Sequence, residues 1–152
     1  MAINQIYAVG AALVDTEVTV SDSFLSGQGI EKGIMTLVDQ SRQAELLDAL
    51  NSSEACILQQ SGGSACNSVV AAAQFGANSC FGGKVANDAD GVLFAADLKQ
   101  ANVQFYSAQS KTGITGKCLV MITDDAERTM NTYLGVSDEF SEDEIDHNAL
   151  IA

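Results

Sequence analysis

Apolar residues along this 152-residue chain fall into short runs, separated by Gly, Asn, Asp and Ser because the chain contains no proline. Continuous β-branched or apolar runs are typical of buried strands, whereas apolar residues three or four positions apart are typical of amphipathic helices. The first pattern predicts strands at 3–9, 33–38, 55–59, 78–85 and 103–106. The second predicts helices at 41–50, 64–75 and 88–101.

Further segments complete the predicted secondary structure. Residues 16–20 alternate Thr, Glu, Val, Thr and Val, which predicts a strand with one solvated face. Residues 117–123 and 129–134 predict paired strands across a polar turn, and the polar stretch 21–31 predicts a loop. Near the C-terminal end, Ser141 and Glu144 have the spacing of a capping box, which predicts a last short helix.

Strands and helices alternate from residue 55 to residue 106, which predicts a parallel sheet with covering helices. We therefore expect strands 55–59 and 78–85 to be parallel neighbours, directly or through one intervening strand. The two early strands, 16–20 and 33–38, interrupt this order, so we expect them to form a separate small sheet. The predicted fold class is α/β.

Composition narrows the possible partners. Hydrophobic residues make up 47% of the chain, enough for a packed core, and the formal net charge is −13. An acidic surface repels phosphate backbones and anionic lipid, so we expect neither a nucleic acid nor a membrane as partner. The segment 138–146 contains six acidic residues and is expected to be a solvated surface.

Cysteine usage and the N-terminal residues indicate a reducing compartment. None of the four cysteines lies at metal-ligand spacing, and each sits in an apolar run, so we expect buried free thiols and no metal site. These residues are Cys56, Cys66, Cys80 and Cys118. His147, the only histidine, lies in the acidic segment and is expected at the surface. No secretion signal or membrane-spanning run appears in the sequence, so a cytoplasmic location is expected.

The segment 62–67, Gly-Gly-Ser-Ala-Cys-Asn, is the most informative part of the sequence. Gly62 and Gly63 stand between a predicted strand and a predicted helix, where glycine allows backbone to approach a ligand closely. The amide of Asn67 both donates and accepts hydrogen bonds, which suits a polyol. An ordinary glycine-rich turn is the alternative interpretation. The segment is neither a Walker A loop nor a dinucleotide-binding fingerprint.

Together with its context, this segment resembles the ribokinase-like (pfkB) kinases. The family's first signature combines a Gly-Gly pair, an Asn shortly after it, a helix ending in Gly, and a Gly-Lys-Val-Gly-Asp-Asp segment. This chain has 62–67, Gly76, and Gly-Lys-Val-Ala-Asn-Asp-Ala-Asp-Gly at 83–91. The strand end at 10–15 and the Thr-Gly segment at 112–120 also fit the family, and 127–135 resembles its hairpin in the adenosine-kinase-like branch.

The resemblance covers the chain from Ile3 to about Ser137 and includes departures from the family pattern. Ala11 stands where many relatives have Asn, Val69 replaces a small residue, and Ala86-Asn87 replaces Gly-Asp. These departures bear on the substrate more than on the fold. The resemblance implies the N-terminal part of a doubly wound parallel sheet with a small β lid. It places the lid strands at about 16–38 and 112–135, and the α/β core at 1–15 and 39–111.

The resemblance also implies a function, namely phosphorylation of a primary hydroxyl of a sugar or nucleoside by ATP with Mg²⁺. Asp15 would accept hydrogen bonds from acceptor hydroxyls, with Gly62, Gly63 and Asn67 as further binding residues. Arg128 would move over the phosphates. The alternative for Asp15 is a turn residue at the end of a strand. The alternative for Arg128 is a solvated charge on the hairpin.

The family's second signature, Gly-Ala-Gly-Asp, carries the catalytic base and is missing from this sequence. We therefore expect the N-terminal portion of a kinase that lacks its C-terminal ATP-binding half, with an uncovered sheet edge and a homodimer as the consequence. A non-catalytic binding or regulatory fragment is the alternative, and a plain nucleotide-binding α/β domain is disfavoured by the missing phosphate loop. The reading frame downstream of residue 152 distinguishes the portion of a kinase from the non-catalytic fragment.

The 152-residue chain is predicted to have no kinase activity, because it contains neither the base nor the anion site that phosphoryl transfer requires. A coupled assay with ribose, fructose, adenosine and inosine should stay at background. The prediction would be contradicted if the wild-type chain turned over one of these compounds and Asp15→Ala abolished that turnover.

Overall fold

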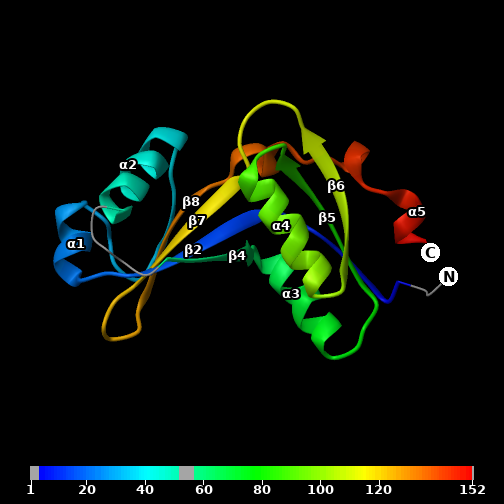
Figure 1. The fold of residues 1–152 in the computed structure, drawn as a ribbon, viewed down its shortest axis with the longest axis horizontal. Helices are drawn as coiled ribbons and strands as arrows, with labels where there is room; N and C mark the ends of the chain where they lie inside the picture. The colour runs from blue at the N-terminus through cyan, green and yellow to red at the C-terminus, as the bar shows by residue number, and fades with distance from the viewer. Residues whose placement is uncertain (1–3, 52–56, 152) are drawn as a thin grey trace. The chain divides into compact units, whose positions relative to one another are not determined.

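The secondary structure follows the apolar pattern along most of the chain (Figure 1). This computed structural model describes residues 4–51 and 57–151. The strands are β1 (Ile6–Val9), β2 (Leu13–Thr19), β3 (Met35–Leu37), β4 (Ile57–Gly62), β5 (Ser79–Ala86), β6 (Val103–Ser110), β7 (Gly116–Ile122) and β8 (Arg128–Tyr133). The helices are α1 (Asp22–Gly27), α2 (Gln40–Asn51), α3 (Ser64–Gln74), α4 (Ala89–Gln100), α5 (His147–Leu150), and the 3-10 turns η1 (Gly135–Glu139) and η2 (Glu142–Glu144).

These elements divide into two units. The first, which we call the parallel-sheet unit, comprises Met1–Val14, Gln60–Gly116 and Leu134–Ala152. The second, which we call the mixed-sheet unit, comprises Asp15–Gln59 and Lys117–Tyr133. The expected division placed α2 in the α/β core, whereas the structure groups this helix with the mixed-sheet unit.

The parallel-sheet unit has three parallel strands in the order β1-β5-β6. Its strands alternate between two faces, and the face with Phe81 and Phe105 packs against α3 and α4. Phe94 of α4 completes this aromatic core, with its ring 5.7 Å from that of Phe81 and 5.2 Å from that of Phe105. The predicted helix 88–101 forms because Asp88 caps its first turn and Lys99 lies in its last.

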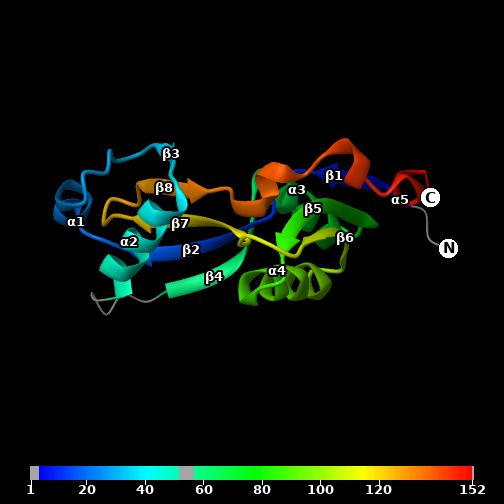
Figure 2. The same ribbon diagram turned by 90° about the horizontal axis from the view of Figure 1, so that it is seen from above.

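The other face of the parallel sheet carries Lys84, whose ammonium group is paired with two carboxylates from the acidic segment. Its Nζ lies 2.9 Å from Glu144 Oε1 and 3.6 Å from Glu139 Oε2. Figure 2 shows α4 on one side of β5 and β6 and the segment from η1 to α5 on the other. Part of the expected solvated surface at 138–146 is therefore attached to the sheet through Lys84. The predicted capping box of Ser141 and Glu144 is present within this segment, at the start of the 3-10 turn η2.

The mixed-sheet unit contains five strands in the order β3-β8-β7-β2-β4. β7 and β8 form the predicted antiparallel hairpin, and β3 joins β8 in parallel. One face of the sheet is covered by α1 and α2 through a cluster of buried apolar side chains. The cluster comprises Val18, Val20, Leu25, Leu46, Leu50, Leu119 and Met121.

The predicted pairing of strands 55–59 and 78–85 is wrong. β4 lies beside β2 in the mixed sheet, whereas β5 pairs with β1 and β6. The burial of β4 gives the reason, because Leu58 is 55% exposed and the following Gln59 and Gln60 are also exposed. A strand of this kind suits the edge of a sheet and not the buried centre of a parallel one.

The stretch 21–31, expected as a loop, contains the short helix α1. Ser21 caps it by accepting a hydrogen bond from the Phe24 amide at 3.1 Å, and Leu25 anchors it in the apolar cluster. Of the cysteines, Cys66, Cys80 and Cys118 are buried and free as predicted, while Cys56 lies outside the described residues. His147 is exposed. Within 4–51 and 57–151, no helix has the length and apolar character to span a membrane.

Gln43 is a polar residue within the apolar layer between α2 and the sheet, with only 2% of its surface exposed. It lies on the same side of α2 as Leu46 and Leu50, and neither its Oε1 nor its Nε2 has a hydrogen-bond partner among the described residues. A buried amide without partners costs about 1–3 kcal/mol.

Gln43→Leu is therefore predicted to stabilise the chain by about 1–2 kcal/mol, because it removes the unpaired polar atoms and keeps the volume. The midpoint of urea unfolding measures this change. Gln40→Leu on the same helix, at an exposed position, is the matched control and should change stability by less than about 0.5 kcal/mol. A urea midpoint for Gln43→Leu that is lower than that of the wild type would contradict this prediction, because it would show that the Gln43 amide has hydrogen-bond partners.

Candidate functional site

Asp15 lies on the face of the mixed sheet that is opposite to α1 and α2. Side chains alternate along a strand, and Val18 and Val20 point into the cluster beneath the helices. Asp15 and Glu17, at odd positions of β2, therefore point to the other side, which we call the second face of the mixed sheet. The alternation thus separates the acidic residues of β2 from its core residues.

The Asp15 carboxyl group is poorly solvated. Its pKa is raised from 3.8 to about 6, chiefly by desolvation and also by the nearby Glu17, although the positive charge of Arg128 acts to lower it. Within the described residues, no donor forms a hydrogen bond to this carboxylate. A carboxylate in such surroundings is an acceptor for donors that arrive from outside the protein, such as hydroxyl groups.

Arg128 begins β8 and contributes the positive charge near Asp15. Its side chain is 55% exposed, and its Nη2 lies 3.6 Å from Glu17 Oε1. Both proposed roles of this residue, a phosphate contact and a solvated hairpin charge, are compatible with this exposure. The structure thus brings together Asp15 and Arg128, which are far apart in the sequence, and adds Glu17.

Cys118 on β7 belongs to the same surroundings. Burial raises the pKa of its thiol, and Asp15 and Arg128 both act on it electrostatically. The Thr132 hydroxyl donates a hydrogen bond to Cys118 Sγ at 3.2 Å. Because a thiol with a raised pKa is a weak nucleophile, Cys118 is part of the wall of this site and not a reactive group.

In the parallel-sheet unit, Gly62 ends β4 and Gly63 precedes α3. Gly63 has a φ of +98°, and a Cβ atom there would lie 2.5 Å from the carbonyl oxygen of Ala11. Only glycine fits this position, and the immediate reason is the contact with the backbone that follows β1. The glycine pair that the sequence indicated thus joins the 10–12 segment to the start of α3.

Asn67 lies in the first turn of α3 and is exposed. It lines a polar groove of about 420 Å³ between α3 and α4, together with Ser61 and Asp97. The Asp97 carboxylate accepts a hydrogen bond from the Ser61 amide at 2.7 Å, which attaches the end of β4 to α4. The Asn67 amide is thus available to a ligand from this groove.

The motif at 83–91 and the Thr-Gly segment meet through Asp88. Its carboxylate accepts hydrogen bonds from the Thr115 hydroxyl at 2.6 Å, the Thr115 amide at 2.8 Å and the Gly91 amide at 2.8 Å. The Thr115 hydroxyl in turn accepts one from the Ala86 amide at 3.0 Å. These bonds give Asp88 a structural role, and they tie two predicted motifs to each other.

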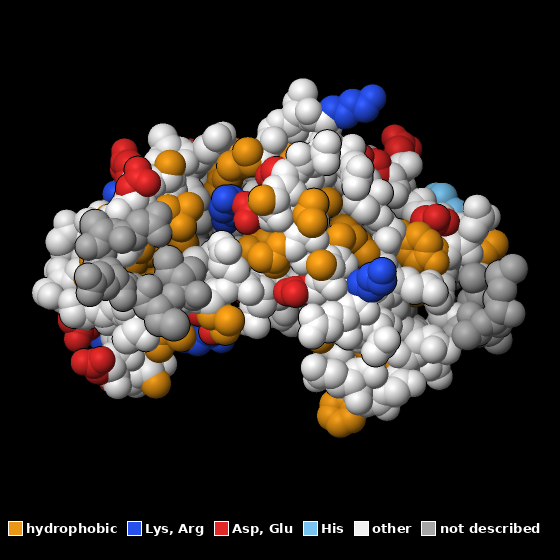
Figure 3. Space-filling model, in the orientation of Figure 1, with side chains coloured by type: hydrophobic (Ala, Val, Ile, Leu, Met, Phe, Trp, Pro, Cys, Tyr) orange, Lys and Arg blue, Asp and Glu red, His pale blue; other side chains and the backbone are white. Residues whose placement is uncertain are grey.

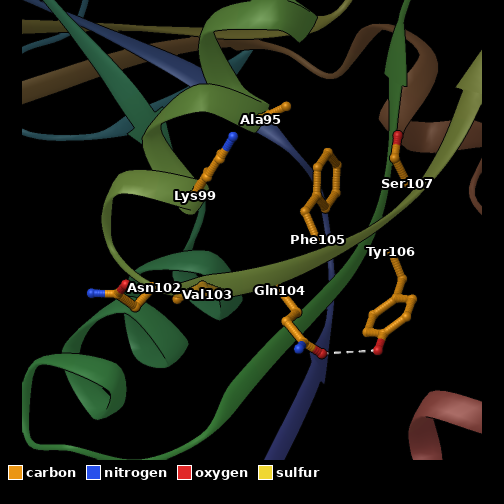
Figure 4. Close-up of a pocket in the computed structure, with 8 residues that line it drawn as sticks. All are labelled: Ala95, Lys99, Asn102, Val103, Gln104, Phe105, Tyr106 and Ser107. Atoms are coloured by element: carbon orange, nitrogen blue, oxygen red, sulfur yellow. Dashed lines mark hydrogen bonds between the residues drawn. The ribbon is translucent and has the colours of Figure 1, made fainter.

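A larger groove lies elsewhere in the parallel-sheet unit, over α4 and β6, where Figure 3 shows hydrophobic side chains gathered at the surface. It measures about 690 Å³ and is lined by Ala95, Lys99 and residues 102–107. In Figure 4, the Tyr106 hydroxyl donates to Gln104 Oε1 at the rim, at 3.0 Å. None of the predicted site residues lines it, and its rim carries no carboxylate, so its size does not make it the acceptor site.

Comparisons with known proteins place the chain in a family. Residues 33–152 match the family described as pfkB family carbohydrate kinase. The chain belongs to this family. A comparison with curated protein sequences returns no match.

Solved structures of pfkB-like kinases agree with this assignment. Adenosine kinase from Sinorhizobium meliloti has a TM-score of 0.89 and 31% identity, over 98% of this chain and 45% of that one. A probable sugar kinase protein from Rhizobium etli CFN 42 has a TM-score of 0.89 and 30% identity, over 99% of this chain and 44% of that one. Anopheles gambiae adenosine kinase, at 19% identity and a TM-score of 0.85 over 99% of this chain and 47% of that one, shares the fold.

The predicted fold class and family resemblance are thus confirmed: the chain has the ribokinase-like α/β fold, in part, and resembles adenosine and sugar kinases. It spans less than half of the length of the structures that it matches. Glu17 and Cys118 were not among the predicted site residues of this pfkB chain. The alternation of residues 16–20 contained the signal for Glu17, because a residue two positions from Asp15 shares its face of the strand.

Asp15→Asn is predicted to stabilise the chain near neutral pH. The pKa of Asp15 is higher in the folded protein, about 6, than the ordinary 3.8, so the folded state binds its proton more tightly. The contribution of this group to stability is therefore greatest below about pH 4 and is lost as the pH rises through 6.

Urea unfolding of the wild type and Asp15→Asn across this pH range isolates the effect, since the other carboxyl groups titrate in both proteins. The stability of the variant relative to the wild type should rise between about pH 4 and pH 6 and then stay constant. A difference that does not vary with pH would show that the Asp15 carboxyl is ordinarily solvated.

Proposed function

We propose that this chain forms the acceptor-binding part of a sugar or nucleoside kinase. The complete kinase would transfer a phosphoryl group from ATP to a primary hydroxyl group of the acceptor. Membership of the pfkB family supports the reaction class. The observation that carries the proposal is the Asp15 carboxylate, which is desolvated and has no hydrogen-bond donor among the described residues. Binding the acceptor would supply those donors.

In this proposal Asp15 accepts hydrogen bonds from two hydroxyl groups of the acceptor. Each bond involves a charged partner and is stronger than a bond between neutral groups. Because the hydroxyl protons favour the ionised carboxylate, acceptor binding would lower the pKa of Asp15 from about 6. The acceptor is thereby oriented by a group that is itself not consumed in the reaction.

The remaining predicted residues have supporting roles. Asn67, which belongs to the other unit, has an exposed amide, and the acceptor contact that the family resemblance implies for it stays a prediction. Gly62 and Gly63 allow α3 to begin close to the backbone after β1, so that its N-terminal amides are held in place. Arg128, more than half exposed, is available to a phosphate group.

ATP with Mg²⁺ would supply the phosphoryl group in the complete enzyme. In residues 4–51 and 57–151, no three His, Cys, Asp or Glu side chains are grouped so as to hold a metal ion. The chain also has no glycine-rich loop with a following Lys and Ser or Thr. Apart from Arg128, which is available to a phosphate group, we therefore assign no residue of this chain to ATP or Mg²⁺. The homodimer expected from the sequence stays a prediction.

Isothermal titration calorimetry of the 152-residue chain with adenosine, inosine, ribose and fructose tests the proposal. At least one of these compounds should bind, and the affinity should increase from about pH 5 to about pH 8 with a midpoint near pH 6, because the ionised carboxylate is the binding form.

Asp15→Asn should weaken binding by about tenfold to a hundredfold, which corresponds to the loss of a hydrogen bond to a charged group. The affinity of this variant should no longer depend on pH. Asp48→Asn, which removes one exposed carboxylate from α2, is the matched control and should bind like the wild type. Wild-type affinity in Asp15→Asn, or no binding of any of the four compounds, would overturn the proposal.

A further inference from the structure

β6 is an edge strand of the parallel sheet, and no other strand of the described residues lies on its outer side. The Ser110 carbonyl group accepts a hydrogen bond from the Asn87 amide, which follows β5, so the backbone groups of Ser110 point toward β5. Because these groups alternate along a strand, the even-numbered residues of β6 bond to β5 and the odd-numbered ones point outward. The sheet therefore ends in a row of outward amide and carbonyl groups. The residues that provide them are Val103, Phe105, Ser107 and Gln109.

β6 has none of the features with which edge strands usually avoid pairing. Its eight residues, VQFYSAQS, include no charged residue and no proline. Its register with β5 runs from 103 to 110 without a bulge. Natural edge strands are usually short, charged or bulged, because an uncovered edge recruits further strands. The other edge strand of this sheet, β1, has only four residues, so β6 offers the longer row of backbone groups.

The charge of the chain limits where a second copy can approach. Two copies with a formal net charge of −13 repel each other, so they associate most easily through a surface that is locally not acidic. The groove along α4 and β6 is such a surface, because Lys99 is the only charged residue among the described residues that line it. A symmetric pairing of two edges uses up both of them, so assembly through β6 stops at two copies.

Antiparallel pairing of β6 with itself has one natural centre. The outward backbone groups are symmetric about Tyr106, so a twofold axis there places Val103 opposite Gln109 of the second copy. Phe105 is then opposite Ser107 of the second copy. All of these residues use their outward amide and carbonyl groups. The two Tyr106 side chains face each other in the closely spaced type of pair, which has no hydrogen bonds.

The side chains on both faces of β6 suit this pairing. In Figure 4, Phe105 points toward α4, whereas Tyr106 points to the opposite side of the strand. On the α4 side, the large ring of Phe105 would lie opposite the small side chain of Ser107. On the other side, the Tyr106 ring already lies 5.9 Å from the ring of Tyr7, so pairing brings the tyrosines of both copies together. Aromatic pairs across strands stabilise a sheet.

We propose that two copies of this chain join antiparallel along β6, about a twofold axis at Tyr106, into one continuous sheet. The sequence predicts a homodimer as the consequence of an uncovered edge, and this inference assigns the edge. It does not depend on the acceptor role of Asp15, because Asp15 and β6 belong to different units. An extended segment of another protein, added to the same edge, is the competing occupant.

Cysteine cross-linking tests the register. Tyr106→Cys places two thiols opposite each other, in a pair whose Cα atoms are about 4.5 Å apart, within the range of a disulfide. Mild oxidation should therefore give a covalent dimer on a denaturing gel without reductant. Gln104→Cys, on the same face of β6, is the matched control. Its two thiols would be about 14 Å apart along the strands, so it should give no more covalent dimer than the oxidised wild type.

Light scattering at micromolar concentration measures the assembly without a cross-link. The wild type should have the mass of a dimer. Ser107→Pro should weaken dimerisation by about tenfold or more, because it removes an outward amide from each copy and no hydrogen bond to β5. Ser107→Thr keeps that amide and should remain dimeric. Circular dichroism and urea unfolding of Ser107→Pro verify that the monomer is folded.

Three outcomes would overturn the inference. The first is a monomeric wild type, which would leave the edge to the competing occupant. The second is a dimer that persists in Ser107→Pro and dissociates in Val9→Lys, because Val9 lies on β1 and is 45% exposed, so the interface would be the other edge of the sheet. The third is the absence of a covalent dimer in Tyr106→Cys, which decides the matter even if Ser107→Pro does not fold.

Discussion

The desolvation of the Asp15 carboxyl group is the constraint on which the interpretation of the mixed-sheet unit depends. A carboxylate that has no hydrogen-bond donor in the part of the chain that the structure describes makes the folded chain less stable at neutral pH than an amide would. Active and binding sites are where such unfavourable groups persist, because a ligand supplies the missing interactions. The alternation along β2 makes this arrangement possible, since Val18 and Val20 anchor this segment in the apolar cluster on the opposite face.

The parallel-sheet unit is organised differently, around two charged side chains that have partners within the protein. The Asp88 carboxylate accepts three hydrogen bonds, two of them from Thr115, and through them joins the start of α4 to the segment before β7. On the other face of the sheet, Lys84 retains the acidic segment. The motif residues thus fall into two groups. Some, such as Asp88, hold the backbone in place, and others, such as Asp15 and Asn67, are available to a ligand.

The sequence predicts most elements of this fold because their local signals agree, as in α4, where Asp88 and Lys99 mark the two ends of the helix. It misplaces β4, because an Ile-Leu run resembles a buried strand although Leu58 is 55% exposed. Motif resemblance predicts Asp15 and Arg128 as site residues. It does not predict the raised pKa of Asp15, because the burial of that carboxyl group depends on which strands become neighbours.

The contact between Gly63 and the carbonyl group of Ala11 has a consequence for which positions of this loop can vary. The contact uses backbone atoms of residue 11, so it constrains position 63 to glycine while leaving the side chain at position 11 free to vary. Ala11, which stands where the family resemblance leads one to expect Asn, is such a variation. The side chain at position 11 could therefore be exchanged without rebuilding the backbone contact at Gly63, so that the loop persists while its side chains change.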